Sequence, residues 1–477
     1  MEYEIVMGLE VHVELATSTK LFCSCSAHFG ALPNQNTCPA CIGMPGSPPA
    51  LNKKALELGI RAAILTDSKI ANTMYFDKKN YFYPDLPTGY QITQLFAPIC
   101  TDGYVDIKTD NKDKRITLKQ IHMEEDAGKL IHDNLMGASL IDYNRASVPL
   151  IEIVSNPDFS TADEVCAYLD TLRTLLSFSD VSDCKMQEGS MRCDVNISVR
   201  PIGQTTYGTR TEIKNMNSIT AIAAAIAYES QRHIDILEGV IKDELVQETR
   251  RWDETKLVTL SMRAKENLAD YRYFPNPEIL PINLEEDFIN KIKDTMPESS
   301  KAKYQRLTTT LNLSEYDTNI LISSKRLVDI FDQVLSHYNK PKEVANWIIV
   351  ELLAIGKTTN KGADDIDINI QKFAKLIELV DTKIINRTVA KDILGLILSD
   401  NIDPLEYIEK NNLKMVSDTS AIETIVDEVL ANNPKAIEDY KNGHEKSFGF
   451  LVGQTMKKLG GKAAPQVINE LLKTKLQ

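Results

Sequence analysis

EIVMGLEVHVEL, residues 4–15, alternates apolar and polar side chains with the two-residue period of a β-strand. The apolar set is Ile5, Met7, Leu9, Val11, Val13 and Leu15. Glu10 and His12 fall on the opposite, polar face. The pattern predicts a half-buried strand that presents these two side chains together. We expect this strand to form one wall of a metal-dependent active site.

Three regions of the chain differ in texture. Residues 1–292 mix strand patterns, turns and a few helices, whereas 293–408 favour helices with little Gly or Pro. Residues 409–477 form a further helical unit that Pro434 and several glycines divide. Within the middle region, SSKRLVDIFDQVLSHY (323–338) places its apolar residues on one helical face. We therefore predict an α+β protein: a mixed or antiparallel sheet domain with a catalytic cradle, an all-α domain and a small all-α tail.

The composition is that of a globular protein. The 477 residues are 43% hydrophobic and 25% charged, and the formal net charge is −13. An acidic chain is unlike a general nucleic-acid binder, whose footprint is basic. The first residues, MEYEIVMG, lack the features of a signal peptide, and no run approaches the ~20 apolar residues of a membrane span. We expect a cytoplasmic protein without membrane contact.

The last 32 residues depart from this acidic balance. Residues 446–477 contain six Lys and one acid, Glu470. Such a segment is either a solvated helical face or a small module that contacts a phosphate backbone.

Four cysteines form two close pairs, Cys23-x-Cys25 and Cys38-x-x-Cys41. Two such pairs on turns can surround one zinc ion with four thiolates. The alternatives are unpaired buried thiols, which we expect for Cys100 and Cys166, or a nucleophilic cysteine. A nucleophile needs one thiolate with a base rather than four thiols. A closed zinc site of this kind is structural.

Carboxylates recur on other predicted strands. Residues 193–199 place Asp194 and Asn196 on one face, and residues 211–215 place Glu212 and Lys214 two positions apart. Any one such strand could simply be the wet face of a sheet. Glu152 differs because it lies inside the apolar run VPLIEIV, where a carboxylate is costly unless it meets a cation or a donor.

The segment 117–126 contributes Glu124 and Glu125 at its end, but its sequence leaves the buried face undecided. Several acidic strands with nearby lysines suit Mg²⁺ and a nucleotide, since Mg²⁺ prefers carboxylates, water and phosphate oxygens. The chain has neither a GxxxxGK[ST] phosphate loop nor a GxSxG elbow. Nucleotide use would therefore rest on an uncommon fold.

These segments resemble one known family, the B subunits of the aspartyl/glutamyl-tRNA amidotransferases. The resemblance covers nearly the whole chain in order. It is carried by MGLEVHVEL (7–15), NYFYPDLPTGYQITQ (80–94), HMEEDAGK (122–129), DYNRASVPLIEIVS (142–155), QEGSMRCDVNISVR (187–200), GTRTEIKNMNS (208–218) and FGFLVGQTMKKLGGKAAPQVINELL (448–472).

The resemblance implies an ATP-dependent transamidation of misacylated Glu-tRNA(Gln) or Asp-tRNA(Asn). ATP phosphorylates the side-chain carboxylate of the esterified amino acid, and ammonia then displaces phosphate. Glu10, His12 and Glu125 become the leading Mg²⁺ ligands. The remaining site residues divide into an acidic wall of Glu124, Glu152, Asp194 and Glu212, and a nucleotide- or substrate-binding set of Lys79, Ser190, Asn196, Lys214 and Asn215.

The resemblance also implies partners. The sequence contains no amidase signature, so ammonia would come from an amidase subunit, with a small third subunit completing the enzyme. The helical regions would hold tRNA. Two other functions compete: a non-catalytic, zinc-stabilised tRNA-binding or assembly subunit, and an ATP-dependent ligase of a small carboxylic acid.

Overall fold

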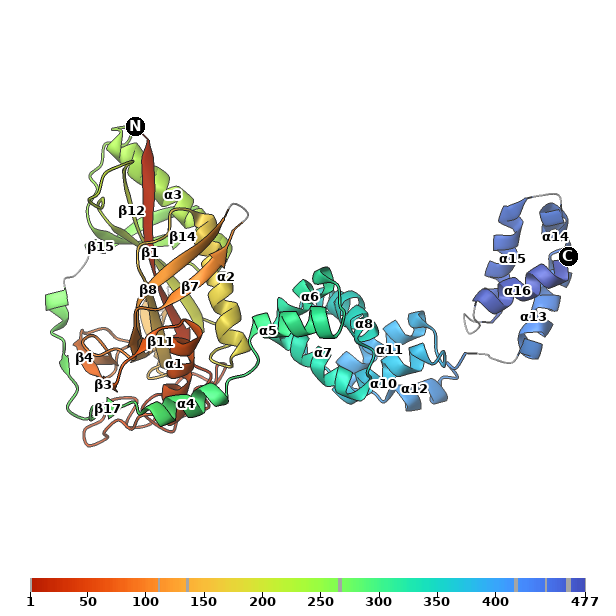
Figure 1. Ribbon diagram of the computed structural model, residues 1–477, viewed down its shortest axis with the longest axis horizontal. Helices are drawn as coiled ribbons and strands as arrows, with labels where there is room; N and C mark the ends of the chain where they lie inside the picture. Colours follow the sequence, from red (N-terminus) through yellow and green to blue (C-terminus); the bar gives the residue numbers. More distant parts are fainter. Residues whose placement is uncertain are drawn as a thin grey trace. The chain divides into compact units, whose positions relative to one another are not determined.

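The computed structural model describes residues 2–109, 112–133, 137–264, 268–415, 419–441, 444–459 and 465–476. The chain divides into two compact units, Met1–Ser300 and Lys301–Gln477. The first is rich in sheet and the second is helical (Figure 1). The predicted α+β class is confirmed. Both predicted domain boundaries, after residues 292 and 408, fall inside helices, α4 (Glu286–Asp294) and α12 (Pro404–Lys410). The division into three domains stays a prediction.

A ten-stranded sheet organises the first unit. Its order is β15-β14-β13-β12-β1-β11-β8-β6-β2, with β7 also paired to β8. All pairs are antiparallel except β13 with β14. The strands are β1 (Tyr3–Glu14), β2 (Lys69–Ile70), β6 (Cys100–Thr101), β7 (Tyr104–Lys108), β8 (Asp113–Glu125), β11 (Pro149–Ser155), β12 (Met191–Pro201), β13 (Thr211–Lys214), β14 (Glu248–Asp253) and β15 (Val258–Ala264).

The core lies on one face of this sheet. Met7, Leu9, Val11 and Val13 of β1 are buried, as the alternation of the first strand predicts. Helices α2 (Ala162–Phe178) and α3 (Ile219–Leu237) cover this face, and α1 (Lys53–Leu65) contributes to the same core (Figure 1). The opposite face therefore remains available for the polar side chains of the central strands.

Smaller sheets accompany the large sheet in the first unit. β4 (Asp77–Asn80), β5 (Tyr90–Thr93) and β16 (Phe274–Pro275) form one of them. The pairs β3 (Thr73–Met74) with β17 (Ile282–Asn283), and β9 (Lys129–Asp133) with β10 (Ala138–Asp142), are two-stranded.

The second unit is built from helices. The predicted helix at 323–338 is confirmed as α7 (Lys325–His337), which begins after Ser324 because the Ser324 side chain accepts a hydrogen bond from the Leu327 N–H. The other helices are α5 (Ser300–Gln305), α6 (Glu315–Ile322), α8 (Pro341–Asn346), α9 (Leu353–Thr358), α10 (Ile370–Asp381), α11 (Arg387–Asp400), α13 (Thr419–Asn432), α14 (Pro434–Lys441), α15 (Glu445–Lys458) and α16 (Pro465–Leu476). Helices α13 to α16 enclose a hydrophobic core of their own. No helix in the described residues is long and apolar enough to span a membrane.

A buried charge network ties α3 to the edge of the large sheet. Glu229 of α3 has no exposed surface. Its carboxylate accepts hydrogen bonds from Arg232 (2.6 Å) and from Thr259 of β15 (2.6 Å), and it lies 3.1 Å from His233 Nε2. Burial raises the pKa of Glu229, but the bonds from His233, Arg232 and Thr259 outweigh it and lower the pKa to about 2.

Replacing Glu229 with Gln should lower the free energy of unfolding of the sheet unit by about 3 kcal/mol at neutral pH, because it leaves a buried cation partly uncompensated. A folded pKa below the unfolded value stabilises the protein above pH ~4.5, and this contribution disappears as the pH falls toward 2. Denaturant titrations of wild type and Glu229→Gln should therefore converge at acid pH. Exposed Glu254→Gln is the control; a constant difference at all pH values would contradict this account.

Candidate active site

The polar side chains of β1 lie beside charged side chains of the neighbouring strands, on the same face of the sheet. β1 lies between β11 and β12, and its residues 10–13 are each directly opposite one residue on either side. His12 is opposite Glu152 of β11, and Glu152 is opposite His122 of β8. Residues directly opposite in antiparallel strands point to the same face. Three strands therefore place His12, Glu152 and His122 in one row.

Glu124 of β8 completes this first group. His12 Nε2 lies 3.5 Å from Glu124 Oε1 and 3.6 Å from Glu152 Oε2. His122 Nε2 lies 2.9 Å from the same Glu152 oxygen. One ligand atom each from His12, Glu124 and Glu152 lies within 4.8 Å of the others, which is the spacing of donors around one cation.

The pKa shifts of His12, His122 and Glu152 show that this group favours a bound positive charge. Burial lowers the pKa of His12, but Glu152 and Glu124 outweigh it and raise the pKa to about 9. His122 behaves likewise, with a pKa raised to about 10. Burial raises the pKa of Glu152, but His122 and His12 outweigh it and hold that pKa well below its usual value. A metal ion at His12 would supply this positive charge in place of a proton.

A second carboxylate group continues the row along the same face. Glu10 is opposite Asp194 of β12, and Glu212 of β13 is opposite Asn196 of β12. The carboxylates of Glu10, Asp194 and Glu212 lie within 4.8 Å of one another. Burial, followed by repulsion from Glu152 and Glu212, raises the pKa of Glu10. The two groups thus act on each other electrostatically.

Neighbouring donors hold the second group in place. Asn196 Nδ2 donates to Glu10 (3.0 Å), and Thr249 Oγ1 donates to Glu212 (2.8 Å). The Lys214 ammonium binds Asp194 and lies 3.3 Å from Glu212. The oxygen-rich donor set of both groups fits Mg²⁺, which takes carboxylate oxygens and keeps several ligand positions for water or phosphate.

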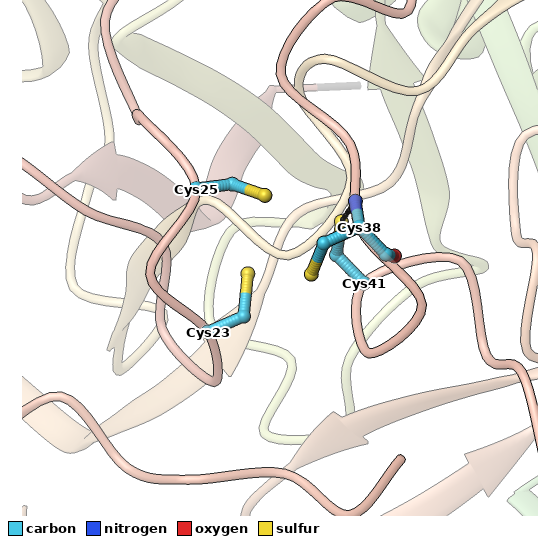
Figure 2. Close-up of side chains that lie close together, drawn as sticks. All are labelled: Cys23, Cys25, Cys38 and Cys41. Carbon is cyan, nitrogen blue, oxygen red and sulfur yellow. Dashed lines mark hydrogen bonds between the residues drawn. The ribbon is translucent and has the colours of Figure 1, made fainter.

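The four paired cysteines converge on one point. Figure 2 shows Cys23 and Cys25 on one segment facing Cys38 and Cys41 on another. Their four sulfurs lie within 4.8 Å of one another. The Cys38 backbone N–H donates to Cys41 Sγ at 3.2 Å. The donor set and its two turns fit a four-thiolate zinc site.

Comparison with known proteins identifies the relatives of this architecture. The family model described as "GatB/GatE catalytic domain" matches residues 5–290, and the one described as "GatB domain" matches residues 329–476. The chain belongs to the GatB family. Its resemblance to amidotransferase B subunits is thereby confirmed.

Individual GatB relatives match along their whole length. A protein of Lachnoclostridium phytofermentans, named as the B subunit of an aspartyl/glutamyl-tRNA(Asn/Gln) amidotransferase, is 50% identical over 471 residues, covering 99% of this chain and 98% of its own. Proteins of the same name from Thermoanaerobacter pseudethanolicus (47%, 100% of both chains) and Agathobacter rectalis (49%, 98% of both) are similar.

The family resemblance implies that Glu125 binds Mg²⁺ together with Glu10 and His12. In this GatB chain, however, Glu125 belongs to neither carboxylate group. Successive strand residues point to opposite faces, so Glu124 turns toward His12 and Glu125 turns away. Glu125 Oε1 accepts a hydrogen bond from the Ile92 N–H (2.9 Å). Burial raises its pKa to about 7. The carboxylate lines a cavity of about 330 Å³ beside the cysteine loops, together with Met44 and Tyr90.

The predicted nucleotide- and substrate-binding residues are more scattered. The Lys79 ammonium lies 4.9 Å from the centre of the Tyr271 ring. Ser190 donates to Asp183 and accepts from the Lys185 N–H (2.9 Å), and Asn215 donates to the Trp252 carbonyl (3.2 Å) at a left-handed φ of 66°. Ser190 therefore bonds within its own loop and Asn215 bonds to the backbone of β14, whereas Asn196 and Lys214 contact the carboxylates.

Two residues of the site were given no role from the sequence, although one of them, His122, begins the motif HMEEDAGK (122–129). His122 shares Glu152 with His12, and its spacing of two from Glu124 was the available signal. Arg192 lies opposite His12 and binds Asp126 at 2.6 Å. Its spacing of two from Asp194 on one strand could have indicated it.

The cysteine geometry predicts about one zinc ion per chain. Cys25→Ser should reduce the zinc content of the purified full chain and lower its melting temperature, because it removes one of four ligands. With free zinc at 1,000 times its dissociation constant, the stabilisation lost is about 4 kcal/mol. Metal analysis by mass spectrometry and thermal melting measure both, with Cys166→Ser as control. Wild-type protein without zinc, or equal loss in both variants, would contradict the site.

Proposed function

We propose that this chain is the transamidating subunit of a tRNA-dependent amidotransferase, acting on Glu-tRNA(Gln), Asp-tRNA(Asn) or both. The observation that carries the proposal is the pair of carboxylate groups on the polar face of β1, in a chain that belongs to the GatB family. The full-length relatives are named as the B subunit of this enzyme.

The chemistry explains why the site is acidic. A carboxylate is a poor electrophile with a poor leaving group, so an oxygen of the substrate carboxylate attacks the γ-phosphorus of ATP and ADP departs. Ammonia then attacks the acyl carbon, and phosphate leaves with the C–O electron pair. Mg²⁺ held by the carboxylate groups would bind the ATP phosphates and offset the charge of phosphoryl transfer.

The residues divide this work by position. His12, Glu124 and Glu152 form one candidate Mg²⁺ site, and Glu10, Asp194 and Glu212 form a second. We assign Glu124 beside His12 in place of Glu125, whose carboxylate bonds to the Ile92 N–H instead. Lys214 holds Asp194 and Glu212 in place and can contact a phosphate with its third donor. Lys79 is a candidate for the aminoacyl end.

Partners complete the reaction. An amidase subunit would release ammonia from glutamine or asparagine, and a small third subunit would join the assembly. Ammonia kept from bulk water on its way stays unprotonated and nucleophilic. The tail would contact tRNA through Lys446, Lys457 and Lys473, because Lys458 and Lys475 bind Glu428, Glu423 and Asp427 within the tail. Lys462 lies outside the described residues.

The decisive experiment assembles the chain with its amidase partner and measures amide formation on Glu-tRNA and Asp-tRNA with glutamine, ATP and Mg²⁺. We expect product only from the assembly. Glu152→Gln should reduce ATP-dependent phosphorylation of the aminoacyl-tRNA by at least ~10²-fold, because the carboxylate that unites His12 and His122 loses its charge.

The matched control is Glu4→Gln. Glu4 lies on the same strand and the same face as Glu10, but it pairs with Arg200 at 2.6 Å away from the carboxylate groups. Its activity should equal that of wild type. Charged-tRNA-dependent ATP turnover that survives Glu152→Gln would refute the site. Turnover that never requires tRNA would favour a small-acid ligase, and its complete absence in the wild-type assembly would favour a non-catalytic role.

The tail makes a separate prediction. Deleting residues 409–477 should weaken tRNA binding by about tenfold or more at moderate salt, because cationic contacts with phosphates are lost. ATP affinity should change little, since α13 to α16 have their own core and the sheet unit has another. Filter binding with labelled tRNA and equilibrium dialysis with ATP separate the two effects. Unchanged tRNA affinity would refute the role of the tail.

A further inference from the structure

Among the cysteine loops lies a lysine without exposed surface. Lys20 is 0% exposed, a rare environment for an ammonium group. Its backbone is fixed on both sides: its N–H donates to the Cys25 carbonyl (2.9 Å), and its own carbonyl accepts from Asn52 Nδ2 (3.2 Å). The side chain is therefore directed inward by the same segment that carries Cys23 and Cys25.

The ammonium of Lys20 has two hydrogen-bond acceptors. Nζ lies 3.5 Å from Cys41 Sγ and 3.1 Å from the Tyr143 carbonyl oxygen. Within the described residues, no carboxylate oxygen lies within 4.0 Å of it. Burying an ammonium costs several kcal/mol unless an anion compensates it. The sulfur of Cys41 is the group placed to provide that negative charge.

A four-thiolate zinc site has an excess of negative charge. Four thiolates around Zn²⁺ carry a formal net charge of −2, and Cys41 is the buried member of the four cysteines. Cys41 receives two donors on its sulfur, the Lys20 ammonium and the Cys38 backbone N–H at 3.2 Å. Such outer contacts orient a ligand and alter metal affinity. The positive charge of the Lys20 ammonium therefore offsets part of the negative charge of the metal-bound cluster.

We propose that Lys20 is a positioning residue of the cysteine cluster, whose buried ammonium compensates the charge of the metal-bound thiolates and thereby sets the affinity for zinc. This inference rests on the proposed zinc site and adds a residue that does not itself bind the metal. Through the Tyr143 carbonyl, Lys20 also connects the cluster to the segment that leads into β11 and Glu152.

Lys20→Met tests the proposal, because methionine keeps a similar length without the charge. The full chain, freed of metal, is titrated with Co²⁺, whose thiolate charge-transfer absorption reports four-sulfur binding. Lys20→Met should bind Co²⁺ 10- to 100-fold more weakly than wild type. The control Lys54→Met removes a half-exposed lysine of α1 that lies 3.8 Å from Glu57, and its affinity should not change.

Thermal melting without metal separates this role from simple packing. The gain in melting temperature on adding Co²⁺ should be smaller for Lys20→Met than for wild type, because only the metal-bound cluster carries the charge of four thiolates that the Lys20 ammonium compensates. Equal Co²⁺ affinity in wild type and Lys20→Met would overturn the proposal. So would an equal loss of melting temperature with and without metal. Wild-type protein that binds no Co²⁺ would overturn the zinc assignment together with Lys20, whereas the transamidation assay tests the carboxylate site independently.

Discussion

The fold of the first unit depends on how one carboxylate is accommodated in the middle of a wide sheet. Glu152 lies on β11 with apolar neighbours before and after it, and its strand is enclosed by β1 and β8. A histidine on each adjacent strand approaches its carboxylate, so the negative charge is shared across three strands. This arrangement joins strands distant in the sequence by charge as well as by backbone hydrogen bonds. Because the Glu152 carboxylate is held ionised, a positive charge beside it, on a histidine or on a metal ion, stabilises the site.

The apolar half of the same strands explains why the acidic half can be so crowded. Met7, Leu9, Val11 and Val13 pack under α2 and α3 and fix the positions of the backbone. The close-packed core then keeps the strands in position although the carboxylates on the other face repel one another. The site is preorganised because its supporting residues alternate with its functional ones along each strand.

Much of this could be predicted from local patterns, and the remainder could not for identifiable reasons. The faces of β1 and the span of α7 follow from periodicity and, for α7, from the capping serine. The sequence could not show which of Glu124 and Glu125 faces the site, because either face of the strand would present one of these two adjacent acids. Lys20 looks like an ordinary polar residue in the sequence, and its burial depends on Cys41 and Tyr143, far along the chain. Both predicted domain boundaries fell within helices, because a change in composition along the sequence does not mark where a helix ends.

The adjacent acids of β8 carry a consequence for strand alignment. If β8 slipped by one residue against β11, Glu125 would replace Glu124 beside His12, and the acidic site would still receive a carboxylate. The two adjacent acids therefore do not specify the alignment, but the same slip would place Met123 opposite Glu152 and remove the contact between Glu152 and His122. The slip would also carry the buried Ile121 and Met123 from the core to the polar face, which opposes it further. The hydrophobic residues on the reverse side of the sheet therefore help to keep the acidic side chains in register.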